Sequence, residues 1–261
     1  MSGKIDAINA KDKETNYWKN YHYIRQRFKA MTEQELQNFA CLLERVKVVA
    51  IFLDEEQDEN SVFESINSAG KPLAGSDLIK NFVFTFRKYK VTHHEEKHLI
   101  ELYTTKFESN FSGTSKQIED ELEAFFREFI ALKTGLKVNK EPKCIYYAFK
   151  KCVGEINDLE SCRSLIMELV KWAVIYQTLR NGMHPDIDHN NLGYLRASFL
   201  TYATLLMDMV DKLSEFEQGS IVVCDKQSLN AAIKQVVVYD VLRFLAGDQA
   251  KELTRFIPTI S

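Results

Sequence analysis

Apolar residues recur along most of this chain at intervals of three and four residues, the spacing that gathers them on one face of an α-helix. The segments with this pattern are 12–30, 32–43, 59–67, 75–90, 93–110, 115–134, 142–153, 158–180, 190–213, 227–246 and 248–256. The 261 residues include four prolines and ten glycines, too few for the many tight turns of an all-β protein. We therefore predict a mainly α fold, a helical array of about ten helices.

Residues at the ends of several predicted helices fit known capping patterns. Thr32 and Glu35 have the spacing of a capping box, in which each side chain accepts a hydrogen bond from the other residue's backbone N–H. Pro142 suits the first turn of a helix, because its missing N–H has no partner there in any case. Gly135 and Gly182 suit the position just after a helix end, where a left-handed backbone is common.

One segment is strand-like. Residues 46–53, VKVVAIFL, are rich in β-branched side chains. A strand needs a partner, and only 221–224 offers a short second candidate, so the partner of 46–53 is expected to be weak, distant or outside this chain. We expect two lobes, 1–90 and 91–261; no linker rich in Pro, Gly or Ser separates them, and a single domain is the alternative.

Composition narrows the function classes. Hydrophobic residues make up 45% and charged residues 27% of the chain, as in a globular protein. The net charge of −3 does not suggest a nucleic-acid binder, and the sequence shows no strong local basic face. Five cysteines without a CxxC pair predict neither a disulfide framework nor a structural zinc site. No signal segment and no stretch of ~20 apolar residues occurs, so a cytoplasmic protein without a membrane partner is expected.

A tight helix–loop–helix corner is predicted within residues 63–81, which read FESINSAGKPLAGSDLIKN. Gly70 can adopt the positive φ that ends the first helix. Pro72 then stiffens the chain and Leu73 can pack inward. The second helix begins directly afterwards, with Asp77 in its first turn.

This corner resembles the signature of the GmrSD-type modified-DNA restriction family, and a looser similarity covers residues 12–180. The residues that carry the resemblance are Phe63, Asn67, Gly70, Lys71, Pro72, Leu73, Asp77, Lys80 and Asn81. The chain departs from the pattern at Ala74, where the family usually has a Ser or Thr that would cap the second helix together with Asp77. Ser76 is the alternative cap here.

The resemblance implies a two-part nuclease system. Such proteins have a ParB-like N-terminal domain with an Asp-Gly-Gln-Gln-Arg type motif, and many add a C-terminal HNH nuclease domain. Neither motif occurs in this sequence. We therefore interpret the chain as the helical part that follows the ParB-like domain, from a truncated gene product or a detached subunit, without catalytic residues or a cofactor of its own.

The corner has two interpretations. The first is a rigid junction whose polar groups are all used in capping, and this interpretation is favoured. The second is a ligand-contacting loop, in which Lys71 and Lys80 would meet phosphate as point charges.

Two polar clusters could bind metal. His94, Glu95 and His98 match HExxH, in which two histidines one helical turn apart hold zinc and the glutamate acts as a general base; Glu119 or Glu123 would be the third ligand. The run lies in a polar stretch, which favours a solvated helix start instead. Residues 184–189, HPDIDH, carry ligand-type side chains but read as an exposed loop between helices.

Three functions remain open. The first is a non-catalytic helical module of a restriction or anti-phage system that positions nuclease domains or mediates assembly with a nuclease partner domain or subunit. It would leave an apolar face exposed where the partner docks. The second is a stand-alone helical interaction protein without a nucleic-acid role, and the third is a zinc hydrolase. Direct DNA contact is compatible with the first function but is not supported by the net charge, and homo-oligomer formation is left open.

Overall fold

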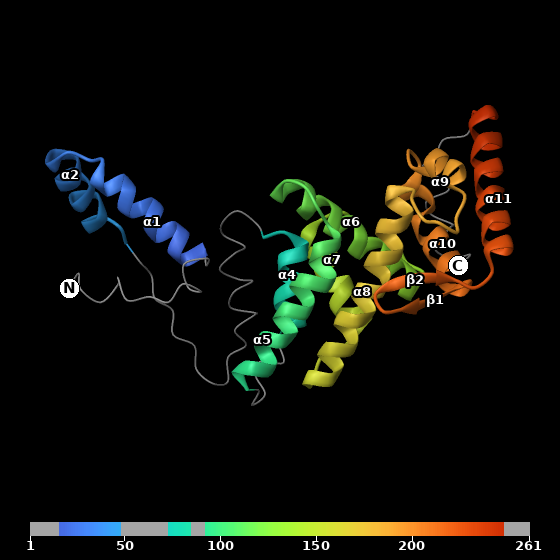
Figure 1. Ribbon diagram of the computed structural model, residues 1–261, viewed down its shortest axis with the longest axis horizontal. Helices are drawn as coiled ribbons and strands as arrows, with labels where there is room; N and C mark the ends of the chain where they lie inside the picture. Colours follow the sequence, from blue (N-terminus) through green and yellow to red (C-terminus); the bar gives the residue numbers. More distant parts are fainter. Residues whose placement is uncertain (1–15, 48–72, 85–91, 248–261) are drawn as a thin grey trace. The chain divides into compact units, whose positions relative to one another are not determined.

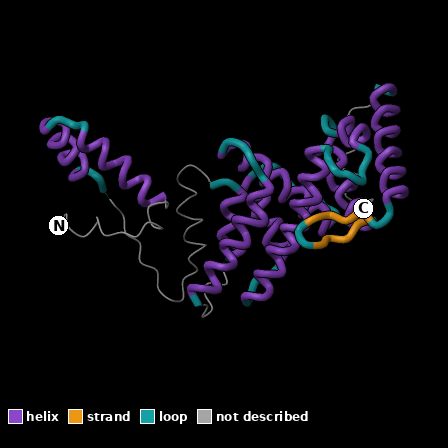
Figure 2. Tube along the Cα trace, viewed as in Figure 1, coloured by secondary structure: helices purple, strands orange, loops and turns teal. Residues whose placement is uncertain are grey.

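The computed structural model describes residues 16–47, 73–84 and 92–247 (Figure 1). The chain divides into two compact units, Met1–Gln57 and Asp58–Ser261. The described residues form ten α-helices and one short antiparallel sheet, so the predicted mainly α fold is confirmed (Figure 2). The boundary expected between residues 90 and 91 lies outside the described residues.

The first unit is described as a helical hairpin of α1 (Asn16–Lys29) and α2 (Glu33–Glu44). Thr32 and Glu35 form the predicted capping box, with Thr32 N donating to Glu35 Oε2 over 2.8 Å. The rings of Phe28 and Phe39 pack edge to face with centroids 5.2 Å apart and join the two helices. None of the side chains described in 17–47 is buried, so this hairpin has no closed core of its own.

The second unit contains the remaining elements. They are α4 (Gly75–Val83), α5 (His93–Leu102), the π-helical turn η3 (Tyr103–Phe107), the 3-10 turn η4 (Glu108–Asn110), α6 (Ser115–Thr134), α7 (Pro142–Val153), α8 (Leu159–Asn181), α9 (His189–Leu195), α10 (Phe199–Lys212), β1 (Ser214–Glu217), β2 (Ser220–Val223) and α11 (Lys226–Leu245). No helix among the described residues combines the length and apolar character that a membrane span requires.

Most predicted helix ends agree with the structure. Helix α6 ends at Gly135, whose φ is 67°, and α8 ends at Gly182, whose φ is 70°. Helix α7 begins at Pro142 as expected. The helix predicted over 190–213 is wrong in one respect, because a turn between Leu195 and Phe199 splits it into α9 and α10. That turn brings the Ser198 hydroxyl within 3.2 Å of a carboxylate oxygen on α11, a tertiary contact that periodicity does not reveal.

The sheet is a two-stranded hairpin in the C-terminal part of the second unit. Strand β2 coincides with the short candidate predicted at 221–224, and it pairs with β1 in antiparallel register. The turn residues Gln218 and Gly219 both have positive φ, 48° and 84°, as a type I′ turn requires. Val46 and Lys47 do not lie in a strand, and residues 48–53 lie outside the described residues, so a strand there stays a prediction.

Aromatic rings form the centre of the second unit. Helix α6 contacts α4, α7, α8 and α10. Phe125 lies 5.5 Å from Phe107 of η3, measured between ring centroids, and Phe126 lies 5.4 Å from Phe149 of α7. Phe149 in turn lies 6.2 Å from Phe82 of α4. The core therefore holds the start of α4, where part of the family motif lies, against α6 and α7.

Candidate functional site

Four of the nine motif residues lie in the part of the chain that the structure describes. Leu73 packs against the hydrophobic core, while Asp77 and Asn81 are exposed on α4 and Lys80 is half-buried. The other five lie outside the described residues: Phe63, Asn67, Gly70, Lys71 and Pro72. The geometry of the site is therefore that of the second helix of the corner.

The N-terminus of α4 is capped from another helix. Ala74 is its N-cap residue and offers no side-chain hydrogen bond, as the departure from the family pattern predicts. The N–H of Gly75 instead donates to Glu123 Oε1 of α6 over 2.7 Å. A carboxylate suits this place because the N-terminal end of a helix carries partial positive charge. The alternative in which Ser76 caps the helix is wrong, because the tertiary carboxylate makes that shift unnecessary.

Burial raises the pKa of Glu123, and the hydrogen bond from Gly75 opposes that shift. The contact also depends on the absence of a side chain at Gly75. A Cβ there would lie 3.0 Å from the carbonyl oxygen of Pro142 and 3.3 Å from its Cα, closer than real Cβ contacts normally are. Only glycine therefore lets α4 begin against the first turn of α7.

Lys80 is engaged by neighbouring side chains. Its ammonium donates to both carboxylate oxygens of Glu108, over 2.7 and 2.9 Å, and lies 5.4 Å from the centre of the Tyr103 ring. A phosphate at this position would have to compete with a bidentate ion pair that is already formed. The described half of the corner therefore fits a rigid junction better than a ligand-contacting loop.

The HExxH residues serve a helix start. Glu95 accepts hydrogen bonds from the backbone N–H and the hydroxyl of Thr92, over 3.0 and 2.5 Å, and completes a capping box for α5. These bonds lower the pKa of Glu95. His94 and His98 are exposed beside it. Among the described residues, no three His, Cys, Asp or Glu side chains are placed to share a metal ion.

The proposed third zinc ligands have other partners. Glu119 accepts from Lys116 over 3.1 Å, and Glu123 caps α4. Both carboxylates therefore take part in the structure of α6 and its neighbours, and the geometry lends the zinc interpretation no support.

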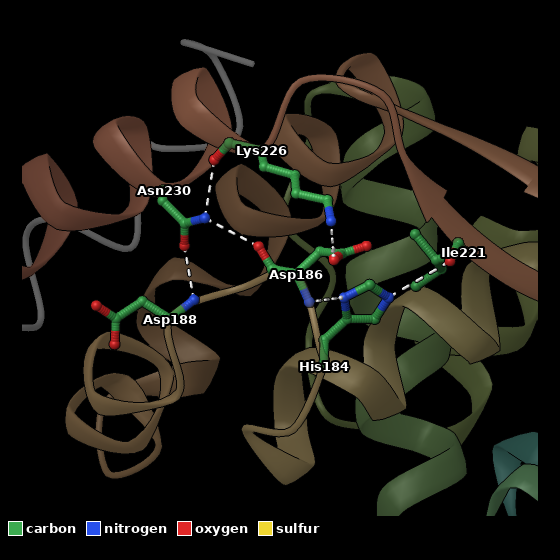
Figure 3. Close-up of polar contacts among 6 residues, drawn as sticks. All are labelled: His184, Asp186, Asp188, Ile221, Lys226 and Asn230. Atoms are coloured by element: carbon green, nitrogen blue, oxygen red, sulfur yellow. Dashed lines mark hydrogen bonds and ion pairs between the residues drawn. The ribbon is translucent and has the colours of Figure 1, made fainter.

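Residues 184–189 form a clamp between β2 and α11, drawn in Figure 3. His184 Nδ1 accepts from the N–H of Asp186 over 3.2 Å, so the opposite nitrogen can donate to the carbonyl of Ile221, 3.4 Å away. Asn230 of α11 donates to the Asp186 carbonyl over 2.9 Å and accepts from the N–H of Asp188 over 2.6 Å. An ion pair also joins Lys226 to Asp186.

The expectation of an exposed loop at 184–189 is therefore wrong for part of it. His184 and Asp186 are half-buried and Ile187 is buried. Their polar atoms bond to a strand and a helix that lie over 30 residues away along the chain, which periodicity cannot reveal. The segment orients α11 and is not arranged as a metal site.

Helix α1 carries a charge pattern that the sequence analysis missed. It has four cations, Lys19, Arg25, Arg27 and Lys29, and no acid. All four are exposed, as is Tyr23, whose relative exposure is 62%. The whole-chain charge of −3 conceals this helix, and a window of one helix length would have found it.

The opposite face of α1 lines an apolar groove. Tyr21, Ile24 and Phe28, spaced by three and four, face Leu36 of α2 across a space of about 430 Å³. Arg25 and Lys29 line the same groove. Ile24 is 50% exposed and Leu36 is 38% exposed, so a partner would bury apolar surface here.

Comparison with known proteins gives one match. Residues 2–84 match the family model described as GmrSD restriction endonuclease, N-terminal domain. The match covers the 63–81 corner and the α1–α2 hairpin, and it assigns them to the N-terminal domain, whereas the sequence interpretation placed the chain after that domain. No curated protein and no solved structure matches the chain.

Proposed function

Because residues 2–84 place this chain in the GmrSD-type restriction family, we propose that it is a non-catalytic helical module that holds the nuclease parts of such a system together. The observation that carries this proposal is the α1–α2 hairpin, in which no described side chain is buried although an apolar groove runs between its helices. A hairpin of this kind gains most of its stability by packing against something else.

The polar groups of the motif support an architectural role. Catalytic groups usually face a cleft and have unsatisfied or displaceable partners. Here Glu123 caps α4, Lys80 pairs with Glu108, and Glu95 caps α5. These side chains stabilise helix starts and helix contacts.

The occupant we propose for the groove is the nuclease-bearing partner of the system, a domain or subunit of ParB-like or HNH type. The groove lies within the segment that matches the restriction family. Its floor is apolar and its rim carries Arg25 and Lys29. It therefore suits an apolar segment flanked by acidic residues.

Substitutions in the groove should release this partner. Tagged chain purified from its native host is expected to bring down a ParB-like or HNH polypeptide, identified by mass. Ile24→Asp and Leu36→Asp should reduce that recovery about tenfold or more, because each buries a carboxylate in the apolar contact. Gln26→Asp, exposed on the opposite face of α1, is the matched control. Recovery of the chain alone would contradict the proposal and favour a stand-alone interaction module.

A second function, DNA contact through the exposed face of α1, is favoured by its four cations and exposed tyrosines. Phosphate contacts make affinity fall with salt, with a slope of about −0.9 per neutralised phosphate on a log–log plot. The triple change Lys19→Gln, Arg27→Gln and Lys29→Gln is expected to reduce this slope by about two to three. Fluorescence anisotropy with a labelled duplex over a series of salt concentrations measures it.

The control for this experiment removes the same charge elsewhere. Lys97, Lys106 and Lys143 are exposed lysines of the second unit. If their replacement by Gln lowers the slope as much as the α1 change, binding follows total charge and α1 has no special part in it.

A further inference from the structure

Helix α11 is apolar on two opposite sides. Its inner side buries Leu229, Ile233 and Val236 against the second unit. The opposite side carries a second series at 231, 235, 238, 242 and 245, which are Ala, Gln, Val, Leu and Leu. Successive members of this series are four, three, four and three residues apart, so they form one stripe along the helix.

This outer stripe is exposed to an unusual degree. Val238 is 42% exposed, Leu242 60% and Leu245 74%, and the adjacent Tyr239 is 50% exposed. No member of the stripe is charged. Contiguous apolar patches of several hundred Å² are uncommon on monomeric proteins, so the stripe is suited to contact with another protein surface.

The spacing identifies the kind of partner. Alternation of four and three averages 3.5 residues, the repeat of a seam between two helices that coil around each other. The polar Gln235 lies among apolar members, as a single polar residue often does at a position that sets the register of such a seam. A flat or extended partner would not require this repeat.

The composition of the stripe favours a second copy of this chain. A two-fold axis places the same patch of each copy against the other, so an uncharged apolar stripe is complementary to itself. With Tyr239 and Phe244, which is 77% exposed, each copy offers apolar surface at this end of α11. Roughly 600 Å² per copy would give a contact of about 1,200 Å², the lower end of specific interfaces.

We propose that the outer stripe of α11 is a homodimer seam in which Val238, Leu242 and Leu245 of one copy pack against a second copy. The clamp at 184–189 and the bonds of Asp240 fix the inner side of α11, and they thereby hold the stripe in a single orientation toward solvent. The inference concerns α11 alone and does not depend on the groove of the first unit.

The test is the mass of the full chain in solution, measured by sedimentation or light scattering over about a hundredfold range of concentration. The wild-type chain is expected to pass from monomer to dimer. Leu242→Asp should weaken the dimer about tenfold or more, because it puts a carboxylate into the seam. Leu136→Asp is the matched control, since Leu136 is an exposed leucine, at 68%, outside α11.

A gain-of-association variant makes the test independent of folding defects. Gln235→Leu replaces the polar member of the seam and is expected to tighten the dimer about tenfold. A chain that stays monomeric at every concentration, with Gln235→Leu as well, would overturn the proposal. So would a dimer that Leu242→Asp leaves unchanged. A monomeric chain whose thermal stability falls on Leu242→Asp would show that the stripe is covered within one copy.

Discussion

Asp240→Ala is expected to lower the free energy of unfolding by about 3 kcal/mol, because it removes one partner of a buried ion pair and leaves the other behind. Asp240 is 7% exposed. Its carboxylate accepts from Tyr202 over 2.6 Å, from Arg243 over 2.8 Å and from Ser198 over 3.2 Å. The change should be measured by urea denaturation, and Asp240→Asn, which retains an acceptor for Tyr202, is expected to cost less.

The same network predicts a pH dependence. Burial tends to raise the pKa of Asp240, but the hydrogen bonds from Tyr202, Arg243 and Ser198 together outweigh it and hold the pKa below its ordinary value. A carboxyl with a lowered pKa stabilises the fold above about pH 3.9, and this contribution is lost as the pH falls through the folded-state value. The wild-type chain should therefore lose more stability on acidification than Asp240→Ala, and equal losses would contradict this account.

Phe125→Ala is expected to lower the free energy of unfolding by about 3 to 5 kcal/mol. Phe125 is fully buried, with its ring centroid 5.5 Å from that of Phe111, 5.4 Å from that of Phe126 and 5.6 Å from that of Tyr176. Truncation leaves a cavity between η3, α6 and α8 and removes several edge-to-face contacts at once.

Chemical denaturation followed by circular dichroism measures this loss, because the second unit supplies most of the helix. Phe125→Leu is the matched control. It keeps most of the buried volume and should cost about 1 to 1.5 kcal/mol. Similar effects for Ala and Leu would show that the cavity collapses and that the aromatic contacts matter little.

Local rules predicted a large part of this fold from the sequence. The capping box at Thr32, the helix stops at Gly135 and Gly182, and the start at Pro142 all depend on interactions within four residues, and the structure confirms each of them. Ala74 was recognised as a helix start without its own cap for the same reason.

The candidate sites were less predictable. The HExxH match suggested zinc because two histidines share a helical face, but the partner of Glu95 is Thr92, three residues earlier. The basic character of α1 follows from residues printed in the sequence, and it was missed because the charge was judged over the whole chain. The turn that separates α9 from α10 leaves a weak local signal, because its support comes from Asp240 on α11.

The sequence by itself determined the helical class, most helix ends and, through residues 63–81, the restriction family, because these depend on short-range spacing and side-chain chemistry. Tertiary structure alone decided which groups meet across distant segments. It gave α4 its cap from Glu123, Lys80 its partner Glu108, and the 184–189 clamp its contacts with Asn230. It also decided that one apolar side of α11 is buried and the other faces solvent. Periodicity shows that a face is apolar, but only the packed chain shows whether anything covers it.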